Sequence, residues 1–193
     1  MKKKTQADFL FEAATLKRLK RTGWQILGDN EESVAEHSYM VAVISYVLAK
    51  ELNADVGRVL SLSLFHDFSE VRVGDVYKLA DCYVSVDEMQ AAKDAFEGSP
   101  APGELMEYFK EYEDEKTTES KIVHDADTLA LCIELKQLVE KGNKHARQWL
   151  EANKKALWLP KSKALYDEIV STNSQAWWDK QRNDIHAGFG KKS

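Results

Sequence analysis

Histidine and acidic side chains with the spacing of metal ligands occur together at residues 66–70. His66 and Asp67 are followed by Glu70, directly after a largely apolar segment. On a helix, Glu70 shares a face with His66 and with Asp67, and His66 and Asp67 lie about 100° apart, close enough for both of their side chains to reach one ion. Because unpaired ionisable groups are costly to bury, this segment predicts a metal ion or a hydrogen-bond network.

Other candidate ligands lie far away along the chain. His37 occupies the first turn of a predicted helix, and Asp125 and Asp127 lie early in a long one. Two histidines and two aspartates from three helices suit a divalent transition ion that keeps positions for water and substrate. Residues two apart on a helix point about 200° apart, so only one of the two aspartates can bind the ion. Spacing does not decide which, and either can instead complement the helix dipole. A second dipeptide of the same kind, His124-Asp125, shows that the pair also arises by chance.

Two more segments carry groups that suit an anionic substrate. The loop at Gly74-Asp75 can bring a carboxylate to the metal, and Lys78 can meet a negative charge. Arg21 offers a planar donor for phosphate, and Trp24 offers an aromatic wall. Each residue also has a purely structural interpretation: a solvated loop, an exposed arginine and a core tryptophan.

The elements that must position these residues are predicted to be helices. Ser33 and Glu36 form a capping-box pattern, as do Ser85 and Glu88, and apolar residues recur every three or four positions. No segment alternates with period two, so the predicted class is all-α, a single-domain bundle of six to eight helices over residues 1–183 with a polar tail at 184–193. The predicted helices are 5–22, 33–52, 55–70, 85–96, 104–115, 118–141, 143–157 and 162–180.

Composition narrows the class of protein further. The 193 residues include 27 Lys and Arg against 32 Asp and Glu, a net charge of −5, and 44% are hydrophobic. A folded core is therefore expected, whereas binding to nucleic acid polymers or anionic membranes is not. The longest apolar stretch, residues 39–49, is too short to span a bilayer. The widely separated Cys82 and Cys132 suit reduced thiols in a cytoplasmic protein.

Taken together, these residues resemble the HD-domain metal-dependent phosphohydrolases, which share an H…HD…D pattern, and in particular their 5'-deoxynucleotidase branch. The resemblance covers about residues 8–160. Five ordered segments carry it, and they are Arg21-Thr-Gly-Trp24, Glu32-Ser-Val-Ala-Glu-His37, His66-Asp-Phe-Ser-Glu70, Gly74-Asp75 and Ala126-Asp127. The loop after Asp75 departs from the family pattern, because it lacks the prolines common there.

The resemblance implies an HD-type helical domain, often a homodimer, that removes phosphate from nucleoside 5'-monophosphates, in particular deoxynucleotides. It implies one divalent ion (Co, Mn, Zn, Fe or Ni) and favours Asp127 over Asp125 as its ligand. The implied metal ligands are His37, His66, Asp67 and Asp127; the catalytic carboxylates are Glu70 and Asp75; the substrate contacts are Arg21, Trp24, Asp75 and Lys78.

A mechanism follows as a hypothesis. Glu70 would orient or deprotonate the attacking water, and Asp75 would protonate the 5' leaving oxygen. Arg21 would clamp the phosphate.

Two alternatives stay open: a non-catalytic module that senses nucleotides, and a hydrolase of another phosphate, such as a cyclic nucleotide or an alarmone. The aromatic pair Trp177-Trp178 is a candidate subunit contact.

Overall fold

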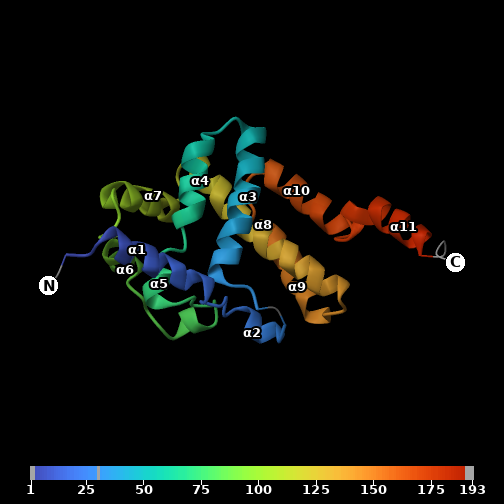
Figure 1. Cartoon of the computed structure of the whole chain (residues 1–193), viewed down its shortest axis with the longest axis horizontal. Helices are drawn as coiled ribbons and strands as arrows, with labels where there is room; N and C mark the ends of the chain where they lie inside the picture. The colour runs from blue at the N-terminus through green and yellow to red at the C-terminus, as the bar shows by residue number, and fades with distance from the viewer. Residues whose placement is uncertain (1–2, 30, 190–193) are drawn as a thin grey trace.

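The computed structural model describes residues 3–29 and 31–189, which are helical throughout most of their length and contain no β-strand (Figure 1). This confirms the predicted all-α class. Several predicted helices are divided, so the segments outnumber the six to eight expected. The α-helices are α1 (Gln6–Ala13), α2 (Trp24–Leu27), α3 (Val34–Leu52), α4 (Val56–Phe65), α5 (Glu70–Val73), α6 (Glu88–Phe96), α7 (Pro102–Asp114), α8 (Thr118–Glu140), α9 (Lys144–Asn153), α10 (Pro160–Ser171) and α11 (Asp179–Gly188).

Helix α3 runs through the middle of the molecule and packs along α8 (Figure 1). Its start is fixed by the predicted capping box: the Ser33 hydroxyl accepts the Glu36 amide at 3.2 Å, and the Glu36 carboxylate accepts the Ser33 amide at 2.7 Å. The helix ends before Asn53, which adopts a left-handed conformation with φ of 54°. These caps place His37 in the first turn, where its side chain is fully buried.

The helix predicted to run to Glu70 is instead two helices joined by a turn. Helix α4 ends at Phe65, and α5 begins at Glu70. The Nδ1 nitrogen of His66 hydrogen-bonds the carbonyl oxygen of Ser63 at 2.8 Å. In a continuing helix, the amide of Asp67 would bond that same oxygen. The side chain therefore competes with the backbone, and the histidine and aspartate lie on a tight turn rather than on a helix.

Phe68 anchors this turn in the smaller of two hydrophobic cores. Its ring centroid lies 5.3 Å from that of Phe9 and 5.1 Å from that of Phe96, so it contacts both α1 and α6. The larger core fills the space between α3, α4, α8, α9 and α10. The turn therefore lies between the two cores. The packing of Phe68 in the smaller core holds the polar residues His66 and Asp67 on the side of the larger core.

Helix α8 begins after Thr117, whose hydroxyl accepts the Ser120 amide at 3.0 Å, and it ends before Gly142 with φ of 100°. Both ends agree with the sequence prediction. Within α8, Asp125 is buried, and its two oxygens accept the backbone amides of Trp158 and Leu159, each at 2.9 Å. Asp125 thus caps the start of α10.

Three other predicted boundaries differ from the structure. The first helix changes after Ala13 into a 3₁₀ turn at residues 14–17. Helix α6 is capped by Asp87, which accepts the Gln90 amide at 2.9 Å, rather than by the predicted box at Ser85. The predicted helix 162–180 is interrupted after Ser171, and α11 then continues to Gly188, into the predicted tail. The last four residues of that tail, 190–193, lie outside the described residues.

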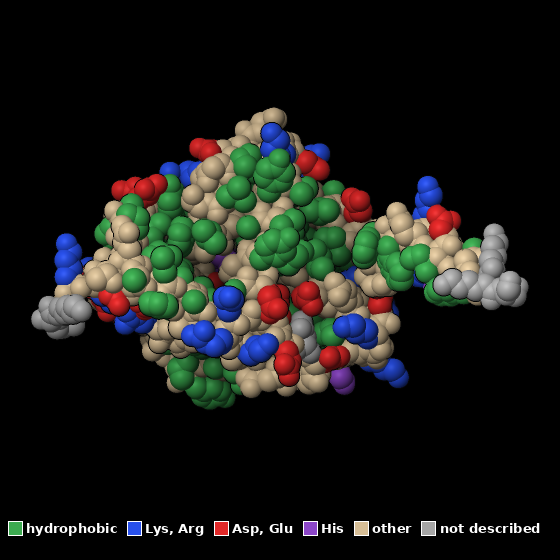
Figure 2. All heavy atoms as spheres, viewed as in Figure 1, with side chains coloured by type: hydrophobic (Ala, Val, Ile, Leu, Met, Phe, Trp, Pro, Cys, Tyr) green, Lys and Arg blue, Asp and Glu red, His purple; other side chains and the backbone are tan. Residues whose placement is uncertain are grey.

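Helix α10 packs against α8, and the chain that follows it, which includes α11, forms an arm that projects from the helical body (Figure 1). Hydrophobic side chains are exposed on this arm and over α3 and α4, as Figure 2 shows. On the arm, Trp177 is 81% exposed; on α3, Tyr39, Val43, Tyr46 and Val47 are exposed along one face. Over the described part of the chain, no helix combines the length and the apolar character that crossing a bilayer requires.

Candidate metal centre

Three of the four predicted metal ligands meet at one point. One ligand atom from each of His37, His66 and Asp127 lies within 4.8 Å of the other two. The fourth, Asp67, places Oδ2 3.2 Å from the Nε2 nitrogen of His66 and 3.9 Å from that of His37. The residues therefore come together from α3, the turn after α4, and α8, although they are distant in sequence.

The buried imidazole nitrogens at this point are suited to a cation. His37 Nε2 lies 2.8 Å from Asp127 Oδ1, yet neither it nor His66 Nε2 has a hydrogen bond with proper geometry among the described residues. Because the Ser63 oxygen can only accept, a neutral His66 carries its proton on Nδ1, and its Nε2 lone pair is then available to a cation beside the carboxylates. Two buried nitrogens and two carboxylates around one space are the donor set of a divalent transition ion.

Negative charge dominates the electrostatics of this centre. Asp67, Glu70, Asp75 and Asp127 all act on Arg21, whose Nη1 lies 3.4 Å from Asp67 Oδ2. Burial alone would lower the pKa of Arg21, but these charges raise it above its usual value. Burial also opposes the charge on His66, and the neighbouring aspartates nevertheless raise its pKa. Even without Glu70, whose pKa is strongly raised, the three aspartates outnumber the single guanidinium, and a divalent cation would neutralise this excess of negative charge.

Glu70 lies beside the ligands at the start of α5. Its Oε2 atom is buried and has no hydrogen-bond partner in the described segments. Burial, followed by the charges of Asp67 and Asp75, raises the pKa of Glu70 to about 10. Without a cation, therefore, this carboxyl group is protonated at neutral pH, and a nearby cation would favour its charged form.

Asp75 joins two loops at the edge of the centre. Its Oδ2 atom accepts the backbone amide of Thr22 and, at 2.9 Å, the Thr22 hydroxyl, which also lies 2.8 Å from the Asp75 carbonyl oxygen. Thr22 follows Arg21, so these bonds fix the loop that carries the guanidinium. Asp75 thus holds Arg21 in place, a contribution that the sequence pattern did not indicate.

Two predicted substrate contacts lie apart from this group. Trp24 is only 3% exposed and packs in the larger core, which leaves no open aromatic face for a ligand. The Lys78 side chain is fully exposed and forms an ion pair with Asp81 at 3.8 Å. His124, from the second His–Asp pair, stacks on Tyr112 with ring centroids 4.0 Å apart and takes no part in the centre.

Sequence reasoning missed Glu32 as a residue of this region. The side chain is 7% exposed, and Oε2 accepts the indole N–H of Trp24 at 3.0 Å. Its Oε1 lies 3.9 Å from His37 Nδ1, on the side of the ring opposite the other ligands. Burial raises the pKa of Glu32, although His37 and Arg21 act against that shift. The only signal in the sequence was its place in the segment that ends at His37.

Known proteins share this sequence pattern. The sequence matches the family described as HD domain over residues 13–163. It is 33% identical over 147 residues to the 5'-deoxynucleotidase HDDC2 of Mus musculus, a match that covers 72% of each chain. A 5'-deoxynucleotidase of Klebsiella pneumoniae is 30% identical over 154 residues, which cover 70% of this chain and 74% of that protein.

The fold agrees with the sequence comparison. The crystal structure of the PH0347 protein from Pyrococcus horikoshii superposes with a TM-score of 0.71 at 33% identity, covering 86% of this chain and 96% of that chain. A conserved hypothetical protein from Pyrococcus furiosus gives a TM-score of 0.72 at 31% identity, over 84% and 98% of the two chains. Since sequence, fold and the converging H…HD…D residues agree, this chain belongs to the HD-domain family.

Proposed function

We propose that the protein is a metal-dependent 5'-deoxynucleotidase, which hydrolyses deoxynucleoside 5'-monophosphates to nucleoside and phosphate. One observation carries the proposal: His37, His66 and Asp127 place ligand atoms within 4.8 Å of one another, next to the half-buried Arg21 and Glu70. Relatives that are 30–33% identical are 5'-deoxynucleotidases, which supports this reaction and substrate class.

The proposed ion is held by His37, His66, Asp67 and Asp127. Mixed imidazole and carboxylate donors suit Co, Mn, Zn, Fe or Ni, and affinity order alone does not select one of them. A divalent ion in such a site supplies Lewis acidity, which lowers the pKa of bound water and offsets the charge of a phosphate. The orphaned Nε2 atoms of both histidines support this ligand set.

In this proposal, side chains of the protein bind the phosphate and transfer the protons. Arg21 binds phosphate oxygens as a planar donor in this proposal, and the Thr22–Asp75 bonds that hold its loop support this role. Glu70 takes a proton from the attacking water or orients it, which requires its charged form. Asp75 gives a proton to the 5' leaving oxygen in this proposal; the side-chain hydrogen bonds made to it by described residues all end on Oδ2. Trp24 acts through Glu32 rather than by touching the nucleoside.

A matrix of metals and substrates tests the proposal directly. Protein stripped of metal by a chelator should release no phosphate from dAMP, dCMP, dGMP, dTMP or dUMP, and one of the five candidate ions should restore release. A panel extended to ribonucleotides, cyclic nucleotides and alarmones separates the alternatives. Binding of nucleotide without phosphate release under every metal would instead support a sensing module, and release only from the added substrates would support another hydrolase.

We also propose a homodimer in the cytoplasm. The exposed arm around Trp177 and the apolar face of α3 around Tyr46 are each suited to a subunit contact, since such aromatic side chains are enriched in interfaces. The free thiols of Cys82 and Cys132 support a reducing compartment. Light scattering after gel filtration should give twice the chain mass, and either Trp177→Ser or Tyr46→Ser should reduce it to one chain. A monomeric wild-type protein would contradict the dimer.

A further inference from the structure

One nitrogen of the metal ligand His37 faces away from the proposed ion. Its Nε2 atom lies 2.8 Å from Asp127 Oδ1, and its Nδ1 atom lies on the opposite side of the fully buried ring. Nδ1 has no hydrogen-bond partner in the described parts of the chain. A neutral imidazole that uses Nε2 as a ligand carries its proton on Nδ1, and leaving that donor buried and unpaired is costly.

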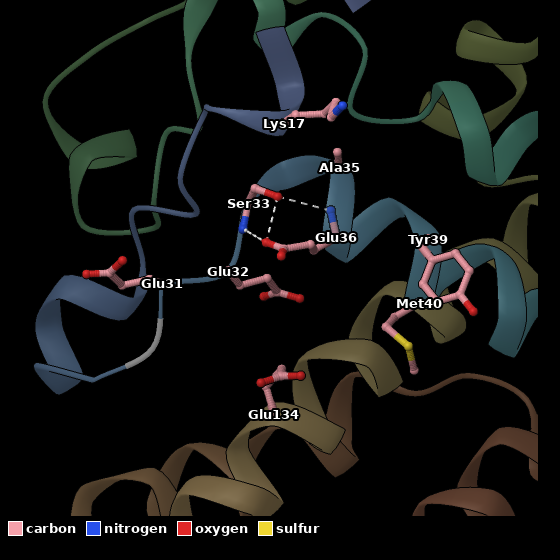
Figure 3. Close-up of a pocket in the computed structure, with 9 residues that line it drawn as sticks. All are labelled: Lys17, Glu31, Glu32, Ser33, Ala35, Glu36, Tyr39, Met40 and Glu134. Carbon is pink, nitrogen blue, oxygen red and sulfur yellow. Dashed lines mark hydrogen bonds between the residues drawn. The ribbon is translucent and has the colours of Figure 1, made fainter. Parts of the chain in front are cut away.

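Glu32 is the carboxylate that faces this nitrogen. Its Oε1 lies 3.9 Å from Nδ1, and a movement of about 1 Å brings the pair into hydrogen-bond range. Figure 3 shows the Glu32 carboxylate beside the first turn of α3, in a cavity that also receives Glu134 from α8. Its second oxygen accepts the Trp24 indole N–H at 3.0 Å, which fixes the orientation of the carboxylate.

The backbone around Glu32 is also fixed. Its carbonyl oxygen accepts the Arg21 amide at 2.9 Å, and the amide of Val34 is bonded to Leu19 oxygen at 2.9 Å. The adjacent Ser33 begins the capping box of α3. A carboxylate held on both sides in this way can hold the histidine ring that it faces.

From these contacts we infer that Glu32 is a positioning residue for His37. Its carboxylate accepts a hydrogen bond from the Nδ1–H group, which orients the ring toward the ion and makes Nε2 a stronger ligand. Trp24, in turn, positions Glu32. Partners of this kind typically change metal affinity 10–100-fold when they are removed. The inference rests on the proposed function only through the metal centre, because it requires no particular substrate.

The test measures Co²⁺ binding by the metal-stripped full chain, through chelator competition and through the visible spectrum of the bound ion. Glu32→Ala should weaken binding 10–100-fold and alter the spectrum, whereas Glu31→Ala, which changes the exposed neighbour in the same cavity, should do neither. Glu32→Gln keeps the shape and an acceptor but loses the charge, so a smaller loss of about 3–10-fold is expected. It also provides a result if the alanine variant does not fold.

If Glu32 only supported the fold and did not act through His37, the double variant would bind Co²⁺ differently. If Glu32 acts through His37, adding Glu32→Ala to His37→Gln should weaken Co²⁺ binding no further. The inference is overturned if Glu32→Ala binds within twofold of wild type, or if its loss persists in full beside His37→Gln. If the wild-type chain binds no Co²⁺ but binds another of the five ions, the same comparison is made with that ion; if it binds none, the metal centre itself is overturned.

Discussion

Glu70→Gln should remove nearly all phosphate release and, at the same time, stabilise the metal-free protein. A positioned general base contributes about 10²–10⁴-fold to a reaction, and glutamine cannot take up the proton. Metal binding should persist, because the four proposed ligands are unchanged. Rate and stability are therefore expected to change in opposite directions in the same variant.

The stability gain has a defined pH dependence. The pKa of Glu70 is raised by burial from an ordinary value of 4.5 to about 10 in the folded protein. Between these two values the folded chain holds a proton that the unfolded chain has lost, so the free energy of unfolding falls as pH rises. One pKa unit corresponds to about 1.4 kcal/mol, so at pH 7 the cost is on the order of 3 kcal/mol. Glutamine removes this cost.

Urea unfolding of chelated protein between pH 5 and 10 measures the effect. The difference between variant and wild type should grow steadily with pH and vanish near pH 4.5. Glu97→Gln provides a matched control, because Glu97 is an exposed glutamate away from the centre. Near-normal turnover by Glu70→Gln would remove Glu70 from the mechanism, and a pH-independent stability difference would mean that its carboxyl group is not protonated in the folded chain.

Local signals in the sequence were sufficient for the helices that depend on local bonds. The Ser33–Glu36 box and the glycine at residue 142 identify the ends of α3 and α8, since each involves only neighbouring residues. The end of α4 could not be predicted in this way. It depends on the His66 side chain bonding the Ser63 carbonyl oxygen, which a pattern of apolar residues does not contain.

The same distinction between local sequence signals and long-range contacts applies to the residues of the candidate site. The residue types indicated the candidate ligands and the family resemblance favoured Asp127 over Asp125, but the long-range contacts determine which of these side chains lie together. In the sequence, Trp24 is equally consistent with a core residue and with a wall for the substrate. Only the fold shows that its indole N–H donates to the Glu32 carboxylate. Glu32 and its neighbour Glu31 are the same residue type, yet the Glu32 side chain is buried beside His37 and the Glu31 side chain is exposed.

The two aspartates of α8 offer the clearest separation of metal binding from folding. Asp127→Asn should abolish tight metal binding and phosphate release, because a neutral amide is a poor replacement for a carboxylate ligand. Its side chain is one-third exposed and caps no helix, so the variant should remain folded. Asp125→Asn should instead keep the metal, because the carboxylate is turned away from the centre toward the start of α10.

Asp125→Asn should instead lower the free energy of unfolding. Asp125 accepts two backbone amides, at Trp158 and Leu159, and an asparagine offers one acceptor oxygen and turns an N–H₂ group toward the other amide. Hydrogen bonds to a charged group contribute about 1.5–3 kcal/mol, so a loss of about that size is expected. Metal content after dialysis and urea unfolding of both variants measure the two effects. If Asp125→Asn loses the metal while Asp127→Asn retains it, the ligand has been assigned to the wrong aspartate, and the geometry that brings Asp127 to His37 is not the one that binds the ion.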